Sequence, residues 1–309
     1  MKKNSTNSPI NLPPRRAALR YLSRTGLSVL GAALAGDAAW AQPHSLQARP
    51  RRIVSVSGSL TEIFYALGAE SQLVGTDTTS LFPAPAQQTA KVGYMRQLSA
   101  EGLLSLRPDA VIGTTEAGPT VVMDQIRSAG VKVELIESDH TWAEVQRKVA
   151  AVGRVAGQQA QSNALLEQLD SQWQDARQSV ARQAGRKPRA LFILAHGAGP
   201  QVAGNKTAAH AMLNFAGLVN PLADSFQGYR PMTAESLVSS APDVIVTSTQ
   251  GIEASGGADK FWSRPGLAMT PAFQRRALVA LDALYLTGFG PRLPQAVVEL
   301  HQAARKVTS

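Results

Sequence analysis

Gly93-Tyr94-Met95-Arg96-Gln97-Leu98-Ser99-Ala100-Glu101 is echoed later in the chain by Gly228-Tyr229-Arg230-Pro231-Met232-Thr233-Ala234-Glu235. In both places a Pro-Asp pair, Pro108-Asp109 or Pro242-Asp243, begins seven positions after the glutamate and leads into a short apolar run. A glycine-tyrosine loop, a Ser/Thr-Ala-Glu helix start and a Pro-Asp entry into a buried strand, repeated about 135 residues apart, indicate one supersecondary unit used twice. The chain is therefore predicted to have two lobes with matching loops.

Strand and helix signals alternate around the first copy of this unit. Residues 52–56 form a short apolar run rich in β-branched residues, and the Ser59-Leu60-Thr61-Glu62 stretch that follows reads as a capping box. Further strands are expected at 110–113 and 131–136, with helices between them. This spacing predicts a mainly parallel sheet covered on both faces. Ligands of such sheets lie beyond the carboxyl ends of the strands, where the Tyr94 loop and residues 114–119 would come together.

A long helical pattern separates the two copies. Apolar residues recur at three- and four-residue steps from Trp142 to Val180, and Gly153 and Gly157 are expected to break the run in two. Strands are expected again at 189–194, 243–249 and 278–281. The prediction is an α/β fold with an N-terminal lobe at 42–154, one long bridging helix at 155–185 and a C-terminal lobe at 186–309. Each lobe would hold a mainly parallel central sheet flanked by helices.

Residues 1–41 are interpreted as a cleaved export signal. Arg15-Arg16 precede a modestly apolar run, and Ala39-Trp40-Ala41 supplies the small residues that a signal peptidase needs. The paired arginines and weak hydrophobicity resemble a Tat signal, although a general secretory signal remains the alternative. The chain has no cysteine for a lipid anchor or a disulfide, and no later stretch approaches the length of a membrane span. A periplasmic location is predicted.

The charge of the chain is concentrated in this leader. Residues 1–41 hold six of the 31 Lys and Arg residues and one of the 22 Asp and Glu residues, so removing them lowers the formal charge from +9 to +4. A nucleic-acid-binding protein is expected to keep a concentrated basic stripe. No nucleic-acid partner is predicted.

Five motifs of the chain together resemble those of the periplasmic haem-binding proteins of bacterial ABC haem importers. They are Gly-Tyr-x-Arg-x-Leu-Ser-Ala-Glu-Gly at 93–102, Ala-Gly-x-x-Thr-Ala-Ala at 203–209, Gly-Tyr-Arg-Pro-Met-Thr-Ala-Glu at 228–235, Pro-Gly-Leu-Ala-Met-Thr-Pro-Ala at 265–272 and Leu-Thr-Gly-Phe-Gly-Pro-Arg-Leu at 286–293. The resemblance covers the chain after the leader. It implies two lobes bridged by a long helix, haem between the lobes and little hinge closure.

Tyr94 is the predicted iron ligand. Ferric iron is hard, so a phenolate oxygen suits it better than the sulfur of Met95, and tyrosinate is an established axial ligand of haem. A free tyrosine has a pKa near ~10, so the iron and a nearby cation must favour the phenolate. Arg96 is placed to be that cation. Arg96, Arg230 or both are also expected to pair with the haem propionates.

The contribution of the second lobe is left open. Tyr229 occupies the position equivalent to Tyr94, where it could coordinate iron, stack on the porphyrin or only border the ligand. His196 lies in a glycine-rich loop, and the resemblance suggests that a histidine there faces the ligand, while a structural histidine is the alternative. The number of bound haems, one or a stacked pair, and any second axial ligand stay undetermined.

Glu101 and Glu235 each fall in the first turn of a predicted helix, where the helix dipole favours a negative charge. The resemblance implies a further role, because matching glutamates of related binding proteins dock on arginines of the permease. The expected partners are therefore haem and an ABC permease with its ATPase subunits, contacted by a monomer, with an outer-membrane haem receptor system upstream.

Common enzyme motifs are missing. The chain has no Gly-x-Ser-x-Gly, His-Glu-x-x-His or P-loop sequence, so hydrolase, metalloprotease and nucleotide-binding interpretations have no anchor. A binding protein rather than an enzyme is predicted. The alternatives are a binding protein of the same fold for a ferric siderophore or cobalamin and, less favoured, a periplasmic haem-modifying enzyme, which would show turnover.

Overall fold

The first lobe is built on a four-stranded sheet. The computed structural model describes residues 51–182, 185–195 and 199–309. The strands are β1 (Ile53–Val56), β2 (Leu73–Thr76), β3 (Ala110–Thr114) and β4 (Lys132–Ile136), in the spatial order β2-β1-β3-β4, and every neighbouring pair is parallel. A parallel sheet has crossover connections that place helices on both of its faces. The predicted mainly parallel sheet is confirmed here.

Both faces of this sheet are covered, because successive side chains of each strand point to opposite sides. Ile53 and Ile112 pack with α1 (Gly58–Ala66) and α4 (Trp142–Ala156) on one face. Val54, Val56 and Val111 pack with α2 (Ala100–Ser105) and α3 (Thr120–Ser128) on the other face. Two short 3-10 turns, η1 (Glu70–Gln72) and η2 (Ala84–Gln88), lie in the connections around β2.

The second lobe has a mixed sheet. Its strands are β5 (Ala190–Leu194), β6 (Gln201–Ala203), β7 (Tyr229–Pro231), β8 (Val244–Ser248) and β9 (Leu278–Leu281), in the spatial order β7-β6-β5-β8-β9. Strands β5, β8 and β9 are parallel, as predicted, whereas β6 and β7 pair antiparallel. The chain returns from β5 to β6 within a few residues, and so short a connection cannot make the crossover that a parallel pair requires.

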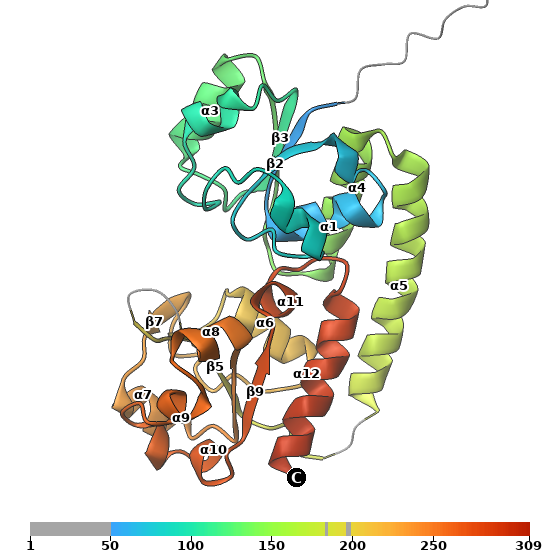
Figure 1. Ribbon diagram of the computed structural model, residues 1–309. Coiled ribbons are helices and arrows are strands. Elements are labelled where there is room, and N and C mark those ends of the chain that lie inside the picture. Colours follow the sequence, from blue (N-terminus) through green and yellow to red (C-terminus); the bar gives the residue numbers. More distant parts are fainter. Residues whose placement is uncertain (1–50, 183–184, 196–198) are drawn as a thin grey trace, which may run out of the picture. The chain divides into compact units, whose positions relative to one another are not determined.

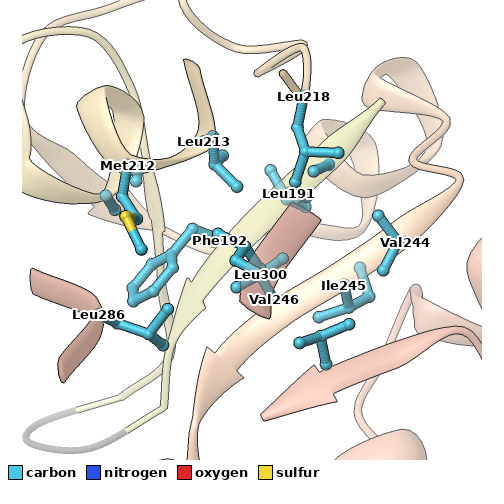
Figure 2. Packing of buried hydrophobic residues seen from close by; sticks show 14 of the residues in the cluster. Leu191, Phe192, Met212, Leu213, Leu218, Val244, Ile245, Val246, Leu286 and Leu300 are labelled. Carbon is cyan, nitrogen blue, oxygen red and sulfur yellow. The ribbon is translucent and has the colours of Figure 1, made fainter. Parts of the chain in front are cut away.

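The core of the second lobe lies between its parallel strands and the surrounding helices. These are α6 (Ala208–Phe215), α7 (Ala234–Ser240), α8 (Thr249–Ala254), α9 (Ala258–Trp262), α10 (Pro271–Gln274), α11 (Ala283–Thr287) and α12 (Leu293–Thr308), together with the 3-10 turn η3 (Leu267–Met269). Figure 2 shows Leu191 and Phe192 of β5 among Met212 and Leu213 of α6, and Leu300 of α12 beside them. Their burial packs α6 and α12 against β5.

One long helix, α5 (Gln159–Ala181), connects the lobes. It runs beside α4 of the first lobe and α12 of the second (Figure 1). Gly157 adopts a left-handed conformation with φ of 70° and ends α4, so the predicted break there is confirmed, whereas Gly153 stays inside α4. With 23 residues, α5 is shorter than the predicted 155–185 and spans roughly 34 Å at 1.5 Å per residue. No helix of the described residues is long and apolar enough to cross a membrane.

The predicted capping box at Ser59 is wrong. Helix α1 begins at Gly58, so its N-cap residue is Ser57, and no side chain caps it. Ser59 instead lies 3.0 Å from the Ser57 hydroxyl, and Glu62 makes two hydrogen bonds of 2.9 Å with Arg292 of the second lobe. A local sequence pattern pointed to a helix cap, but a partner 230 residues away takes the carboxylate.

Hydrogen bonds of a buried lysine also join the lobes. Lys148 and Glu144 of α4 are both buried and lie 2.6 Å apart. The Lys148 ammonium also donates to the backbone carbonyls of Gly288 and Phe289 in the second lobe. Burial lowers the pKa of Lys148, and the Glu144 carboxylate opposes that shift. Separating Glu62 from Arg292, or Lys148 from the carbonyls of the second lobe, would leave a buried charge with fewer partners, and this cost stabilises the observed arrangement of the lobes.

Candidate functional site

The Tyr94 loop is held firmly at both ends. Gly93 has a φ of 99° and its carbonyl accepts a hydrogen bond from Thr78, which ties the loop to the end of β2. The amide of Gln97 donates to the Tyr94 carbonyl at 2.8 Å and closes a turn. Two further bonds of 2.9 and 3.0 Å join Met95 and Leu98 to Gly118, in the loop after β3. The turn therefore presents Tyr94 at the carboxyl ends of the strands, where 39% of its surface is exposed.

Arg96 forms an ion pair with an acidic residue. Its guanidinium is 3.1 Å from a carboxylate oxygen of Glu116, and both side chains are partly exposed. Partial desolvation lowers the pKa of Arg96, but the charge of Glu116 and the phenols of Tyr94 and Tyr229 outweigh it, so the net shift is upward. Arg96 is thus a permanent positive charge close enough to Tyr94 to interact with it.

Tyr229 comes from an edge strand of the other lobe. It opens β7, opposite Ala203 of β6, and follows Gly228, which has a φ of 78°. Burial raises the pKa of Tyr229 to about 12, and hydrogen bonds with the Ala209 backbone and the Thr207 side chain oppose the shift. Although 36% of the residue is exposed, its hydroxyl lies near the start of α6. A phenol with this pKa stays protonated at neutral pH.

The two lobes bring their predicted residues together. Glu116 and Arg96 of the first lobe both influence the ionisation of Tyr229, and Tyr94 and Tyr229 both influence that of Arg96. Charges act on one another in this way only over short distances. Two phenols, one guanidinium and one carboxylate, drawn from both lobes, are thus near enough to affect one another's ionisation.

Arg230 is directed elsewhere. Its guanidinium lies over the Phe226 ring, with 4.8 Å between the guanidinium carbon and the ring centroid. Such cation–π stacking stabilises the side chain in place, by about 0.5–1 kcal/mol at an exposed site. His196 lies outside the described residues.

Glu101 and Glu235 occupy equivalent positions on the surface. Each is the second residue of a short helix, α2 or α7, and both are exposed. The hydroxyls of Ser99 and Thr233 accept hydrogen bonds from the third residue of their helices and cap them. Neither glutamate makes an ion pair with another residue of the described chain.

Sequence reasoning missed two contributors to this region, Glu116 and Thr207. Glu116 follows β3 directly, in a loop predicted to lie near the site, so its position beyond a strand end was the available signal. Thr207 caps α6 by accepting from the His210 amide at 3.0 Å, and its contact with Tyr229 depends on the pairing of β7 with β6. No local pattern in the sequence indicates that second contact.

Comparisons with known proteins agree with this architecture. The model of a family described as periplasmic binding protein matches residues 53–285. The solved structure of the periplasmic haem-binding protein BhuT, in complex with two haems, is 42% identical and superposes with a TM-score of 0.79 over 84% of this chain and 99% of that one. An uncharacterized ABC transporter substrate-binding lipoprotein, YvrC of Bacillus subtilis, is 28% identical over 86% of this chain and 84% of its own length.

A third relative is named for a different ligand. The vitamin B12-binding protein of Vibrio cholerae is 26% identical over 83% of this chain and 91% of its own length. The relatives therefore include proteins named for haem and for a corrinoid.

Proposed function

We propose a haem-capture role for this chain, which belongs to the periplasmic binding protein family. The observation that carries the proposal is the Tyr94–Gln97 turn, because it holds an exposed phenol close to Arg96 on a loop tied down by four backbone hydrogen bonds. A planar ferric porphyrin needs an anionic oxygen ligand on its axis and cations for its two carboxylates. Tyr94 supplies the first and Arg96 one of the second.

Arg96 acts on the tyrosine through its charge. A positive charge within a few ångströms favours the phenolate over the phenol, and the ferric ion adds to the effect when it binds. Glu116 holds Arg96 in place before haem arrives, at 3.1 Å. A haem propionate has the same chemistry as the Glu116 carboxylate, so it would compete for the same guanidinium.

Tyr229 serves a different purpose in this proposal. Because burial raises its pKa to about 12, it remains a neutral phenol. A neutral aromatic ring with an exposed portion suits stacking against a porphyrin face. We assign iron coordination to Tyr94 and an apolar contact to Tyr229.

Delivery of the ligand would involve an ABC permease in the inner membrane. Glu101 and Glu235 are exposed and equivalent on the two lobes, and among the described residues they have no ion-pair partner, as a pair of docking contacts for permease arginines requires. The chain would reach the periplasm through the export signal of residues 1–41 and would bind haem without chemical turnover.

Cobalamin is the second candidate ligand, and the similarity to the Vibrio cholerae protein favours it. The two ligands require different protein groups at the site. Haem carries two free carboxylates and takes an axial ligand from the protein, whereas cobalamin has its carboxylates as amides. The Tyr94 and Arg96 pair has a use in the first case only.

The test is a titration of the protein with haemin and, separately, with cyanocobalamin, followed by visible absorption. Wild type should bind haemin saturably with a ferric tyrosinate spectrum. Tyr94→Phe should lose that spectrum and about 100-fold in affinity, or about 2.7 kcal/mol, because it deletes only the coordinating oxygen. Tyr65→Phe, on α1, is the matched control and should bind as wild type does.

The outcomes separate the two ligands and the two tyrosines. Saturable binding of cyanocobalamin without binding of haemin would replace the haem proposal by the corrinoid one. Haemin binding with an unchanged spectrum in Tyr94→Phe would keep the ligand and remove Tyr94 as its iron contact.

A further inference from the structure

A cavity of about 460 Å³ lies at the C-terminal end of α5, in a part of the molecule that haem capture does not use. Its walls come from α5, the end of α6, α12 and the segment after α5. None of Tyr94, Arg96, Glu116 or Tyr229 lines it. Cavities that hold small organic molecules in proteins have volumes of roughly 300–1,000 Å³, so this one is large enough for a small organic ligand.

The floor of the cavity is aromatic. Trp173 and Phe215 line it, and their rings meet edge to face with 4.9 Å between centroids. Trp142 stacks on Trp173, also at 4.9 Å, and thereby fixes the indole from the side of α4. Rings held in this way form a rigid apolar surface, which favours a flat or aliphatic ligand body at little entropic cost.

The rim of the cavity is cationic. Arg177, Lys187 and Arg305 line it, and no Asp or Glu is among its lining residues in the described part of the chain. None of the three makes an ion pair with a carboxylate within residues 51–182, 185–195 and 199–309. Three positive charges converging on one opening produce a local potential that attracts an anion.

His301 adds a polar group to the same wall. Its Nδ1 lies 2.8 Å from the Ala216 carbonyl, so Nδ1–H donates to that oxygen. The other ring nitrogen, Nε2, is buried and has no hydrogen-bond partner in the described residues. Since the hydrogen is on Nδ1, Nε2 is an acceptor, and a hydrogen-bond donor in the body of a bound ligand would remove the cost of leaving it buried without a partner.

We propose that this cavity is a second ligand site, for an amphipathic organic anion with an aromatic or aliphatic body and one carboxylate or sulfonate group. The body lies on Trp173 and Phe215, and the acidic group faces Arg177, Lys187 and Arg305. The site stands independently of the proposed haem capture, since it shares no residue with the Tyr94 region.

The probe is anilinonaphthalene sulfonate, an aromatic monoanion, titrated into the protein by calorimetry without haemin. Wild type should bind it, and the double variant Arg177→Gln with Lys187→Gln should bind about tenfold more weakly, because two of the three cations are removed. The matched control is Arg182→Gln with Lys306→Gln. It removes two exposed charges from the same neighbourhood, neither of which lines the cavity, and should change affinity less than twofold.

Three results would overturn the proposal. They are no binding by wild type, equal affinity in wild type and the Arg177/Lys187 variant, and equal weakening in both double variants, which would indicate attraction by net charge alone. Because the titration contains no haemin, failure of this site leaves the haem proposal standing. Failure of the haemin titration likewise leaves this site standing.

Discussion

The Tyr94 turn and the Tyr229 strand derive from the same sequence unit, but the surroundings of their tyrosine side chains differ. Both tyrosines follow a glycine with positive φ and precede a capped helix whose second residue is an exposed glutamate. Tyr94, however, begins a turn beside Arg96, whereas Tyr229 belongs to an antiparallel edge strand and has a pKa raised by burial. The two copies therefore share the backbone framework of the unit and differ in the surroundings of their exposed side chains.

The Pro-Asp pair gives the largest difference that we expect between the two copies of the repeated unit. Asp109 accepts the Arg52 amide and Asp243 accepts the Arg189 amide, each at 2.8 Å. Asp243 is also buried and pairs with Arg186 at 2.5 Å. We expect Asp243→Ala to lower the free energy of unfolding by about 3 kcal/mol and Asp109→Ala by about 1 kcal/mol, because loss of a buried, charged acceptor costs more.

Urea denaturation of both variants measures these free energies. The denaturant dependence, or m-value, should equal that of wild type, which keeps the comparison two-state. Equal losses of unfolding free energy in the two variants would show that the hydrogen bond with the backbone amide alone sets the cost. Burial of Asp243 would then contribute nothing.

Tyr229 provides the second test, through its ionisation. With a pKa of about 12 instead of 10.0, the folded protein keeps the phenolic proton longer than the unfolded chain does. The stability that this contributes is complete below pH 10 and is lost as the pH rises from 10 toward 12. The ultraviolet difference titration between wild type and Tyr229→Phe should show a midpoint near 12, and a midpoint at 10 would mean that the hydroxyl is solvated.

The two arginines give a third comparison. Arg96 interacts with Tyr94 and Glu116, whereas Arg230 stacks on Phe226. We expect Arg96→Gln to weaken haemin binding about tenfold, since a charge-assisted contact near the ligand is lost, and Arg230→Gln to weaken it less than threefold. Calorimetric titration with haemin ranks the two variants. The reverse ranking would assign the propionate contact to the second lobe.

Much of the scaffold could be predicted from sequence, because its signals are local. The alternation of strand and helix, the helix starts at Ser99 and Thr233 and the break at Gly157 each depend on residues a few positions apart. The contacts that join the two lobes are not local. Glu62 bonds Arg292 and Lys148 bonds the Gly288 carbonyl, and these partners are separated by 230 and 140 residues.

The same limit applies inside the candidate site. Tyr94 and Arg96 could be singled out because they share one turn, and Tyr229 because it repeats Tyr94. The ion pair of Arg96 with Glu116 and the contact of Tyr229 with Thr207 depend on which loops the sheets bring together. The antiparallel pairing of β6 with β7 likewise joins segments that are separated by α6 in the chain.

The smallest expected effect concerns the two glutamates, where the copies should behave alike. Glu101→Gln and Glu235→Gln should each change the free energy of unfolding by at most about 0.5 kcal/mol, because an exposed charge in a first helical turn contributes little. In vesicles containing the permease and its ATPase subunits, each variant should reduce stimulation of ATP hydrolysis, and the double variant should reduce it further. Glu70→Gln, at another exposed glutamate, is the matched control and should stimulate as wild type does. Full stimulation of ATP hydrolysis by the double variant would mean that the glutamates only stabilise their helices. A loss of stimulation in only one of the single variants would contradict the equivalence of the two lobes that the repeated unit predicts.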